Sequence, residues 1–185
     1  EENNIPANAI VVGTVAVFRF QKRLKEWLQV FKNASDKDEN LFAIIVGDGP
    51  LKQELVQERR ELGLEGKVLM PGLQTNTVNW FSAMDVFMMT SIFEGLPIAL
   101  LEAMSMQCAI VTTDAGGVKE VVGNNESGMM VSIDHWQDLS KELTKLVNSN
   151  DLISQLGNAA RQRVRDSFSL QSMVHQLEKI YKRFH

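Results

Sequence analysis

The sequence predicts an α/β fold in which a parallel β-sheet carries helices on both of its faces. Short runs of apolar, largely β-branched residues alternate with longer segments whose apolar residues recur at helical spacing. Strands that alternate with helices form right-handed βαβ units, which build a parallel sheet between two layers of helices. Glycine-containing turns follow several of the expected strands, at the sheet edge where ligands bind in such folds. A chain of 185 residues is expected to form one domain.

The expected strands are short apolar runs, as is typical of strands that are covered on both faces. They are residues 10–17, 41–46, 68–70, 85–89, 109–112 and 128–131. The first run is nearly all apolar and rich in valine, and the third is short because Pro71 and Gly72 close it.

The expected helices have apolar residues three or four positions apart, which gives each helix one face toward the sheet. They are residues 24–34, 51–62, 77–84, 97–106, 118–122, 136–147, 151–168 and 170–184. The helix at 51–62 follows a Gly-Asp-Gly-Pro turn, and the helix at 97–106 begins at Pro97, because proline fits the first helical turn. The last helix has a broad apolar face, which we expect to be partly exposed or to drive self-association.

Composition excludes several classes of protein. A net charge of −4 argues against a general nucleic-acid-binding protein. The single cysteine, Cys108, cannot form a disulfide within the chain, which fits a cytoplasmic location. Three scattered histidines offer no metal-ligand spacing, so no metal is expected. No apolar run approaches the roughly 18 residues that a membrane-spanning helix needs.

The segment 93–104 contains a candidate anion site at the start of its helix. Leu96 precedes Pro97 and has no side-chain oxygen that could cap the helix. The amides of Ile98 and Ala99 therefore remain free, with the positive end of the helix dipole behind them. Phosphate is the usual ligand of such a site.

Two carboxylates bracket this candidate anion site. Glu102 lies four residues after Ile98, in a helix whose other residues are mostly apolar, so we expect a buried helix with an unusual buried carboxylate. Glu94 precedes the turn, on the other side of the bound anion. Carboxylates on both sides suggest a ligand with hydroxyl groups at both ends, such as a nucleotide sugar. The alternative is a structural helix in which Glu102 pairs with a Lys or Arg and water caps the N-terminus.

Several motifs together resemble a known enzyme family. Glu94 and Glu102, with seven residues between them, are similar to the paired glutamates of retaining glycosyltransferases of the GT-B fold. The sequence of residues 93–104 resembles that of glycosyltransferase family 4 (group 1), as do the sequences of residues 46–51, 113–122 and 126–131. The resemblance implies that residues 1–185 form the Rossmann-like C-terminal, donor-binding half of such an enzyme. It also implies an N-terminal acceptor domain that is absent from this chain.

The resemblance implies roles for a basic turn after the first strand. In the family, an arginine and a lysine hold the diphosphate of the donor nucleotide sugar. Lys22 falls on the lysine position, whereas Val17 occupies the arginine position. Arg19 lies two residues further on and is expected to substitute for that arginine, with Arg23 as the other candidate.

The resemblance also implies roles for residues around the two glutamates. Glu94, aided by the amides of Gly95 and Leu96, is expected to hold the hydroxyl groups of the donor sugar. Glu102 is expected to accept hydrogen bonds from the ribose, and the main chain near Leu73 to contact the base. The donor is expected to be UDP- or GDP-linked, and no metal is implied. For Gly116 and Gly117, turn geometry with positive φ is a sufficient explanation.

Two other classes of function remain open from the sequence. One is another GT-B enzyme, such as a sugar-nucleotide epimerase. The second is a non-catalytic, doubly wound module that binds partners and has no affinity for nucleotides. In the favoured interpretation, the partners are a nucleotide-sugar donor and the protein's own N-terminal domain. Peripheral membrane association is then expected only through that missing half, and this half alone is expected to bind donor without turnover.

Overall fold

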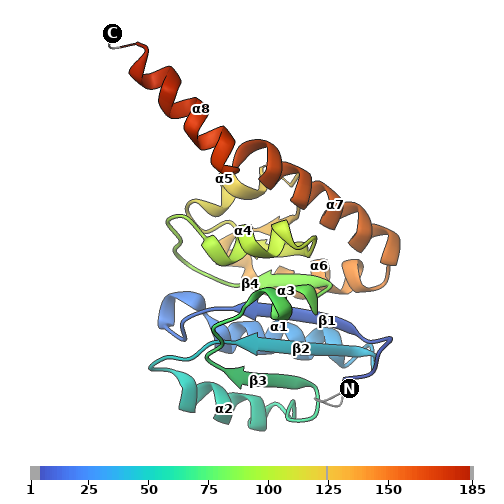
Figure 1. Cartoon of the computed structure of the whole chain (residues 1–185). Coiled ribbons are helices and arrows are strands. Elements are labelled where there is room, and N and C mark those ends of the chain that lie inside the picture. Colours follow the sequence, from blue (N-terminus) through green and yellow to red (C-terminus); the bar gives the residue numbers. More distant parts are fainter. Residues whose placement is uncertain (1–4, 124, 184–185) are drawn as a thin grey trace.

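The computed structural model describes residues 5–123 and 125–183 of the chain. Its centre is one six-stranded sheet in the order β3-β2-β1-β4-β5-β6, in which every pair of neighbours is parallel (Figure 1). The strands are β1 (Ile10–Val15), β2 (Leu41–Val46), β3 (Val68–Gly72), β4 (Val86–Met89), β5 (Ala109–Thr113) and β6 (Met129–Val131). The predicted parallel sheet and all six predicted strands are therefore confirmed.

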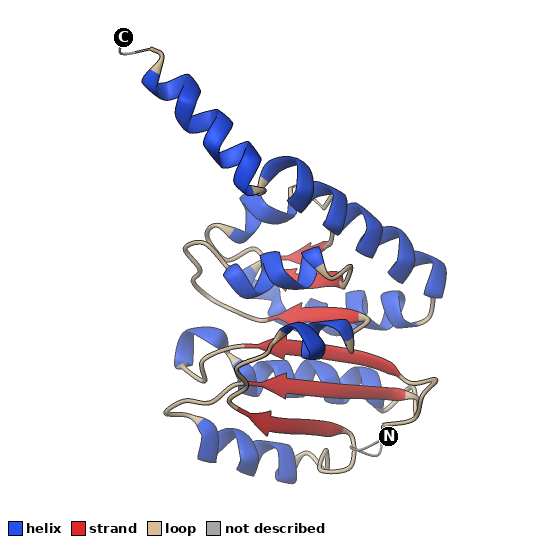
Figure 2. Ribbon diagram, viewed as in Figure 1, coloured by secondary structure: helices blue, strands red, loops and turns tan. Residues whose placement is uncertain are grey.

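Helices cover both faces of the sheet, as the sequence predicts (Figure 2). One layer contains α1 (Leu24–Ser35), α2 (Lys52–Glu61) and α6 (Leu139–Val147). The opposite layer contains α3 (Val78–Ser82), α4 (Ile98–Ser105) and α5 (Val118–Val122). The long helix α7 (Asn150–Ser167) contributes side chains to both cores, and α8 (Leu170–Tyr181) follows it.

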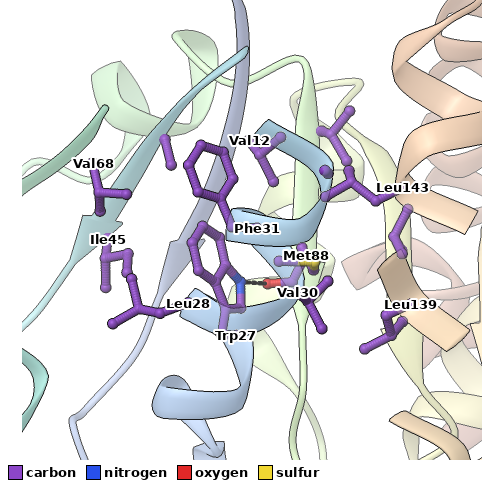
Figure 3. Packing of buried hydrophobic residues seen from close by; sticks show 14 of the residues in the cluster. Val12, Trp27, Leu28, Val30, Phe31, Ile45, Val68, Met88, Leu139 and Leu143 are labelled. Atoms are coloured by element: carbon purple, nitrogen blue, oxygen red, sulfur yellow. Dashed lines mark hydrogen bonds between the residues drawn. The ribbon is translucent and has the colours of Figure 1, made fainter. Parts of the chain in front are cut away.

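The core under α1 is organised by an aromatic pair that contacts the sheet. Trp27 and Phe31, one helical turn apart, are fully buried and stack with ring centroids 5.7 Å apart. The Trp27 indole Nε1–H donates a hydrogen bond of 2.8 Å to the carbonyl of Met88 in β4 (Figure 3). This bond satisfies the only polar group of a side chain that burial would otherwise leave unpaired. The aromatic pair thus fixes α1 against the central strands.

Several element boundaries differ from the sequence-based expectation. β1 ends at Val15 instead of residue 17, and β3 continues through Pro71 and Gly72. A short 3₁₀ helix (Ile133–Asp138) precedes α6, so α6 begins at Leu139 and not at residue 136. Another 3₁₀ turn (Phe20–Lys22) precedes α1. The last helix is described to Tyr181, and the end of its expected range, residue 184, lies outside the described residues.

The apolar face of α8 is exposed, which agrees with the first of the two expectations for it. In Figure 1, α8 extends away from the body of the molecule and follows α7. Its large apolar side chains are between 43% and 67% exposed; they are Leu170, Met173, Val174, Leu177, Ile180 and Tyr181. None of the described residues of α8 is buried.

Candidate functional site

The candidate functional site lies at the carboxyl edge of the sheet, where β1 and β4 are neighbours. A pocket of about 430 Å³ opens there, and segments from five parts of the chain line it. They are the end of β1 and the turn after it (residues 14–17), the residues around the start of α1 (Lys22 and Leu24), the end of β2 and the turn after it (residues 46–48), the loop after β3 (Leu73, Gln74 and Thr77), and the segment from the end of β4 into α4 (residues 89–91, Glu94, residues 96–99 and Glu102). This edge, next to the reversal of strand order, is where parallel α/β sheets bind ligands. The volume falls within the range of small-molecule sites.

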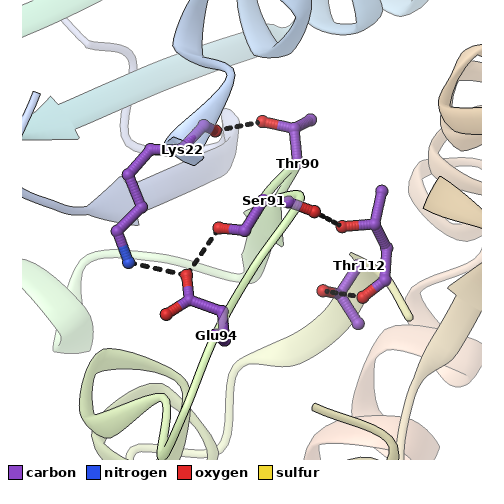
Figure 4. Close-up of polar contacts among 6 residues, drawn as sticks. Lys22, Thr90, Ser91, Glu94 and Thr112 are labelled. Carbon is purple, nitrogen blue, oxygen red and sulfur yellow. Dashed lines mark hydrogen bonds and ion pairs between the residues drawn. The ribbon is translucent and has the colours of Figure 1, made fainter. Parts of the chain in front are cut away.

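Lys22 and Glu94 meet inside this pocket. The Lys22 Nζ atom lies 2.6 Å from Glu94 Oε1, although 72 residues separate the two (Figure 4). The side chain of Lys22 is 23% exposed and that of Glu94 is 9% exposed. The Coulomb attraction within this partly buried pair is stronger than within a fully exposed one, because the local dielectric constant is lower, but burial also costs both ions part of their hydration. The structure therefore brings two predicted site residues into direct contact, which the sequence reasoning did not foresee.

The buried residues Thr90 and Ser91, after β4, hold both members of this ion pair. The Thr90 hydroxyl lies 2.9 Å from the carbonyl oxygens of both Lys22 and Arg23. The Ser91 hydroxyl donates to Glu94 Oε1 over 2.6 Å. Sequence reasoning missed both residues, because two hydroxyl side chains after a strand are equally typical of an ordinary turn.

The start of α4 has the free amides that the sequence predicts, with one shift in register. Pro97 is the N-cap residue of α4 and not its first helical residue, and no side chain of the described residues caps the helix. The amides of Ile98 and Ala99 therefore lie in the first turn, where a helix offers them no internal acceptor. Both residues line the pocket. The positive end of the helix dipole thus points toward the same space as Lys22.

The prediction that Glu102 is buried is wrong. The buried residues of α4 are Leu100, Ala103 and Met104, whereas Glu102 is exposed and lines the pocket. Ile98, on the same face, is 55% exposed. The apolar residues of this helix mislead because some of them face the pocket and not the core. Within residues 5–123 and 125–183, no Lys or Arg forms an ion pair with Glu102, so the alternative of a structural pair is not observed.

The two candidate arginines lie outside the main pocket. Arg19 is exposed and lines a separate cavity with Phe20 and Phe93. Arg23 donates a hydrogen bond of 3.0 Å to the carbonyl of Ile133 and does not line the pocket. Val17, at the position where the family resemblance places an arginine, lines the pocket instead. Of the described residues, only Lys22 contributes a positively charged side chain to the pocket lining.

Asp48 is an additional carboxylate in the pocket lining. Its side chain accepts a hydrogen bond from Lys52 Nζ at 2.5 Å and another from the Gly49 amide at 2.7 Å. These two donors, Lys52 first, hold the pKa of the Asp48 carboxyl below its ordinary value. Asp48 is thus already matched by a cation, and Glu102 remains the carboxylate of the lining without an ion-pair partner among the described residues.

Close backbone contacts fix the loop that carries Glu94. The Gly117 amide donates to the Glu94 carbonyl over 3.1 Å. A Cβ atom on Gly116 would lie 2.3 Å from the Glu94 oxygen, and one on Gly117 would lie 2.0 Å from the Gly95 oxygen. Gly116 has a φ of 51°, but Gly117 has a φ of −64°, so turn geometry does not explain Gly117. Close approach of the loop is what requires glycine there.

The remaining predicted site residues are placed as follows. Leu96 lines the pocket and is 62% exposed; Leu73 also lines it and is 75% exposed. Gly95 is exposed beside the pocket and does not line it. Over residues 5–123 and 125–183, no three His, Cys, Asp or Glu side chains gather as a metal-ligand set would require. Over the same ranges, no helix combines the length and apolar character needed to cross a membrane.

Comparison with known proteins agrees with this geometry. Residues 1–163 match the model of the family described as glycosyl transferases group 1. The chain belongs to this family. It is 32% identical, over 68% of its length, to an N-acetylgalactosaminyltransferase of Campylobacter jejuni that acts on a diphospho-undecaprenol-linked sugar. It is 28% identical, over 98% of its length, to the N-acetyl-alpha-D-glucosaminyl L-malate synthase of Bacillus anthracis. The chain spans only 35% and 47% of these two relatives.

Solved structures of group 1 members and related enzymes share the fold. The structure of HepE from Anabaena in complex with UDP has a TM-score of 0.86 and 22% identity, over 96% of this chain and 50% of that one. The C-terminal domain of a group 1 glycosyl transferase from Francisella tularensis has a TM-score of 0.80 and 23% identity, over 91% of this chain and 90% of that domain. These matches place the chain on the Rossmann-like domain of GT-B glycosyltransferases.

Proposed function

We propose that this chain is the donor-binding domain of a retaining glycosyltransferase that uses a UDP-linked sugar. The observation that carries the proposal is the juxtaposition of Lys22, Glu94 and the free amides of α4 in one pocket at the carboxyl edge of the sheet. The choice of UDP is supported by its presence in structures of HepE and of TarM from S. aureus, which share the fold. GDP remains the second nucleotide to test.

In this proposal, the different parts of the donor bind at different positions along α4 and beside it. The diphosphate binds at the amides of Ile98 and Ala99, because their N–H groups and the helix dipole favour an anion. Lys22 supplies the positively charged side chain, since of the described residues it alone brings one to the lining. Glu102, one helical turn after Ile98, accepts hydrogen bonds from the ribose hydroxyls. The main chain at Leu73 contacts the base.

Glu94 is the group proposed for the donor sugar, with the amides of Gly95 and Leu96 beside it. Breaking the bond between sugar and diphosphate develops negative charge on the leaving phosphate. Cations and amide dipoles already in place stabilise this charge without reorganisation. Lys22, now paired with Glu94, must shift toward the phosphate or be shared with it when the donor binds. Arg19 can assist only if the loop of residues 17–22 moves, because its side chain lies outside the pocket.

The acceptor, the retention of anomeric configuration and the cytoplasmic location belong to the proposal for the whole protein. We propose that an N-terminal domain holds the acceptor and faces this pocket, and that transfer occurs in the cleft between them without a metal ion. The short span of this chain relative to its curated relatives supports a second domain. One relative is named for a lipid-linked sugar and another, from Staphylococcus aureus, for capsular polysaccharide biosynthesis; both support a role in surface polysaccharide synthesis.

Calorimetric titration of the chain with UDP, GDP and ADP tests the proposal. UDP is expected to bind most tightly. Lys22→Met and Glu102→Gln are each expected to weaken UDP binding by about 10- to 150-fold, the equivalent of a hydrogen bond to a charged group. Lys25→Met and Glu178→Gln are matched controls, because Lys25 pairs with Glu54 and Glu178 lies on α8, and neither Lys25 nor Glu178 is part of the pocket lining. If the folded chain binds none of the three nucleotides, the proposed function is wrong for this chain.

A further inference from the structure

The two carboxylate oxygens of Glu94 differ in their hydrogen-bond partners. Oε1 receives both the Lys22 Nζ donor and the Ser91 hydroxyl donor, each at 2.6 Å. Among the described residues, no group donates a hydrogen bond to Oε2. A carboxylate oxygen that accepts two short charge-assisted bonds has little capacity for another strong one. The carboxylate thus has one structural oxygen and one that is free to accept from a ligand.

Ser91 is itself held in place by the neighbouring strand. Its side chain is completely buried, and its carbonyl accepts a hydrogen bond of 2.6 Å from the hydroxyl of Thr113, the last residue of β5. Thr113 is buried too. A chain of hydrogen bonds therefore runs from the end of β5 through Ser91 to Glu94. Polar groups in such a buried chain have few alternative partners, so the geometry is well determined.

Lys22 alone does not determine the orientation of Glu94. Its long, flexible side chain is 23% exposed, and in the proposed function its Nζ atom either shifts toward the diphosphate or is shared with it. Once Lys22 moves, the Ser91 hydroxyl is the remaining donor to Oε1 among the described residues. A serine side chain has a single rotatable bond to its oxygen, and burial restricts that bond further. Ser91 is therefore suited to hold Glu94 both before and after the donor binds.

We propose that Ser91 is a positioning residue for the donor sugar. It fixes the Glu94 carboxylate through Oε1, so that Oε2 accepts hydrogen bonds from ring hydroxyls of a hexose attached to the nucleotide. This inference rests on the proposed function and extends it to a residue that does not itself touch the sugar. Its consequence is selective: loss of Ser91 should weaken recognition of the sugar and leave recognition of the nucleotide unchanged.

The binding test compares UDP with UDP-glucose and UDP-N-acetylglucosamine in the unmodified chain and in Ser91→Ala. The relevant ligand is the UDP-sugar whose affinity exceeds that of UDP by the larger factor. Ser91→Ala is expected to abolish this difference in affinity, while the affinity for UDP itself changes less than about twofold. Ser91→Thr, which keeps the hydroxyl, should restore part of the difference. Ser127→Ala is the matched control, because Ser127 is equally buried and donates over 2.8 Å to the Val122 carbonyl, outside the pocket lining.

A second measurement needs no ligand. Urea midpoints are measured for Ser91→Ala, Glu94→Ala and the double variant, because alanine at residue 94 removes the acceptor of the Ser91 hydroxyl; the same cycle is repeated with Ser127→Ala. Ser91 and Glu94 are expected to couple, so that the double variant shifts the midpoint by less than the sum of the single shifts. The Ser127 cycle is expected to be additive.

The two measurements separate the possible failures. Equal weakening of UDP and UDP-sugar by Ser91→Ala, no weakening of either, or an additive Ser91–Glu94 cycle each overturns the inference about Ser91. If the unmodified chain binds none of these ligands, the proposed function is wrong, and so is the proposed role of Glu94 Oε2 in binding the sugar. In that case, the cycle still reports whether Ser91 holds Glu94.

Discussion

Replacement of Lys22 by methionine would remove one member of the ion pair in the pocket and leave the Glu94 carboxylate with Ser91 as its partner. Glu94 is 9% exposed, so water can compensate for the lost ammonium group only in part. Methionine retains much of the length of the lysine stem, so the change removes the charge while disturbing packing little. The expected result is therefore a loss of folding stability that originates in the uncompensated carboxylate.

The size of this loss follows from the burial of the pair. Removing a partner from a hydrogen bond to a charged group costs about 1.5–3 kcal/mol. A fully buried pair would cost about 3–5 kcal/mol, but Lys22 is 23% exposed, which favours the lower range. The matched variant is Lys52→Met, because the Lys52 and Asp48 side chains are 48% and 39% exposed. Such an exposed pair contributes about 0–1 kcal/mol.

Urea unfolding followed by circular dichroism measures both variants under the same conditions. Adding Glu94→Gln to Lys22→Met should recover at least about 1 kcal/mol, because a neutral amide is less costly to bury than an unpaired carboxylate and can still accept from Ser91. If Lys22→Met costs no more than Lys52→Met, or if the double variant recovers nothing, then the energetic reasoning about this pair is refuted.

Three further predictions concern stability. Gly117→Ala should lower the free energy of unfolding by about 1–3 kcal/mol, because its Cβ atom would overpack against the Gly95 carbonyl. Gly95→Ala has open space around its Cβ position and should change the free energy of unfolding by no more than about 0.5 kcal/mol. Equal urea midpoints for the two variants would contradict this prediction. Burial raises the pKa of the Asp85 carboxyl above its ordinary value of 3.8, so the folded state binds that proton more tightly, and stability falls as pH rises through the raised pKa. The side chain of Asp85→Asn can still accept a hydrogen bond from the Val11 amide. The stability of this variant relative to the unmodified chain should therefore increase between pH 3.8 and the raised pKa of Asp85, and stay constant at higher pH. A stability difference that does not change with pH would contradict this prediction. Trp27→Phe should cost about 1–3 kcal/mol, because it removes the hydrogen bond to the Met88 carbonyl; an unchanged thermal midpoint would contradict the assigned role.

The sheet and its helices were largely predictable because their signals are local. Apolar runs such as 41–46 and periodic segments such as 24–34 report burial directly, and the strand and helix found there agree with them. The 3₁₀ helix at Ile133–Asp138 was missed because Trp136 continues the apolar pattern of α6 toward the N-terminus. Periodicity shows which residues are buried but does not distinguish a 3₁₀ turn from the first turn of an α-helix.

The site was predictable in its residue types and less so in its contacts. The glutamates, Lys22 and the uncapped helix start follow from sequence motifs. The contact between Lys22 and Glu94 depends on β1 and β4 being neighbours, and strand order is not encoded in the alternation of strands and helices. The error about Glu102 has a related cause: a helix that borders a pocket exposes apolar residues such as Ile98, so apolar composition overstates its burial.

The distance in sequence between Lys22 and Glu94 has a consequence for the order of folding. Strands β1, β2 and β3 are complete by residue 72, so a nascent chain of that length contains Lys22 but neither Glu94 nor the start of α4. The pocket arises only after β4 has inserted beside β1, on the side away from β2. Donor binding would then stabilise the finished sheet and none of its earlier intermediates. During synthesis, the ligand could therefore act only on molecules that had already completed the most non-local pairing of the sheet.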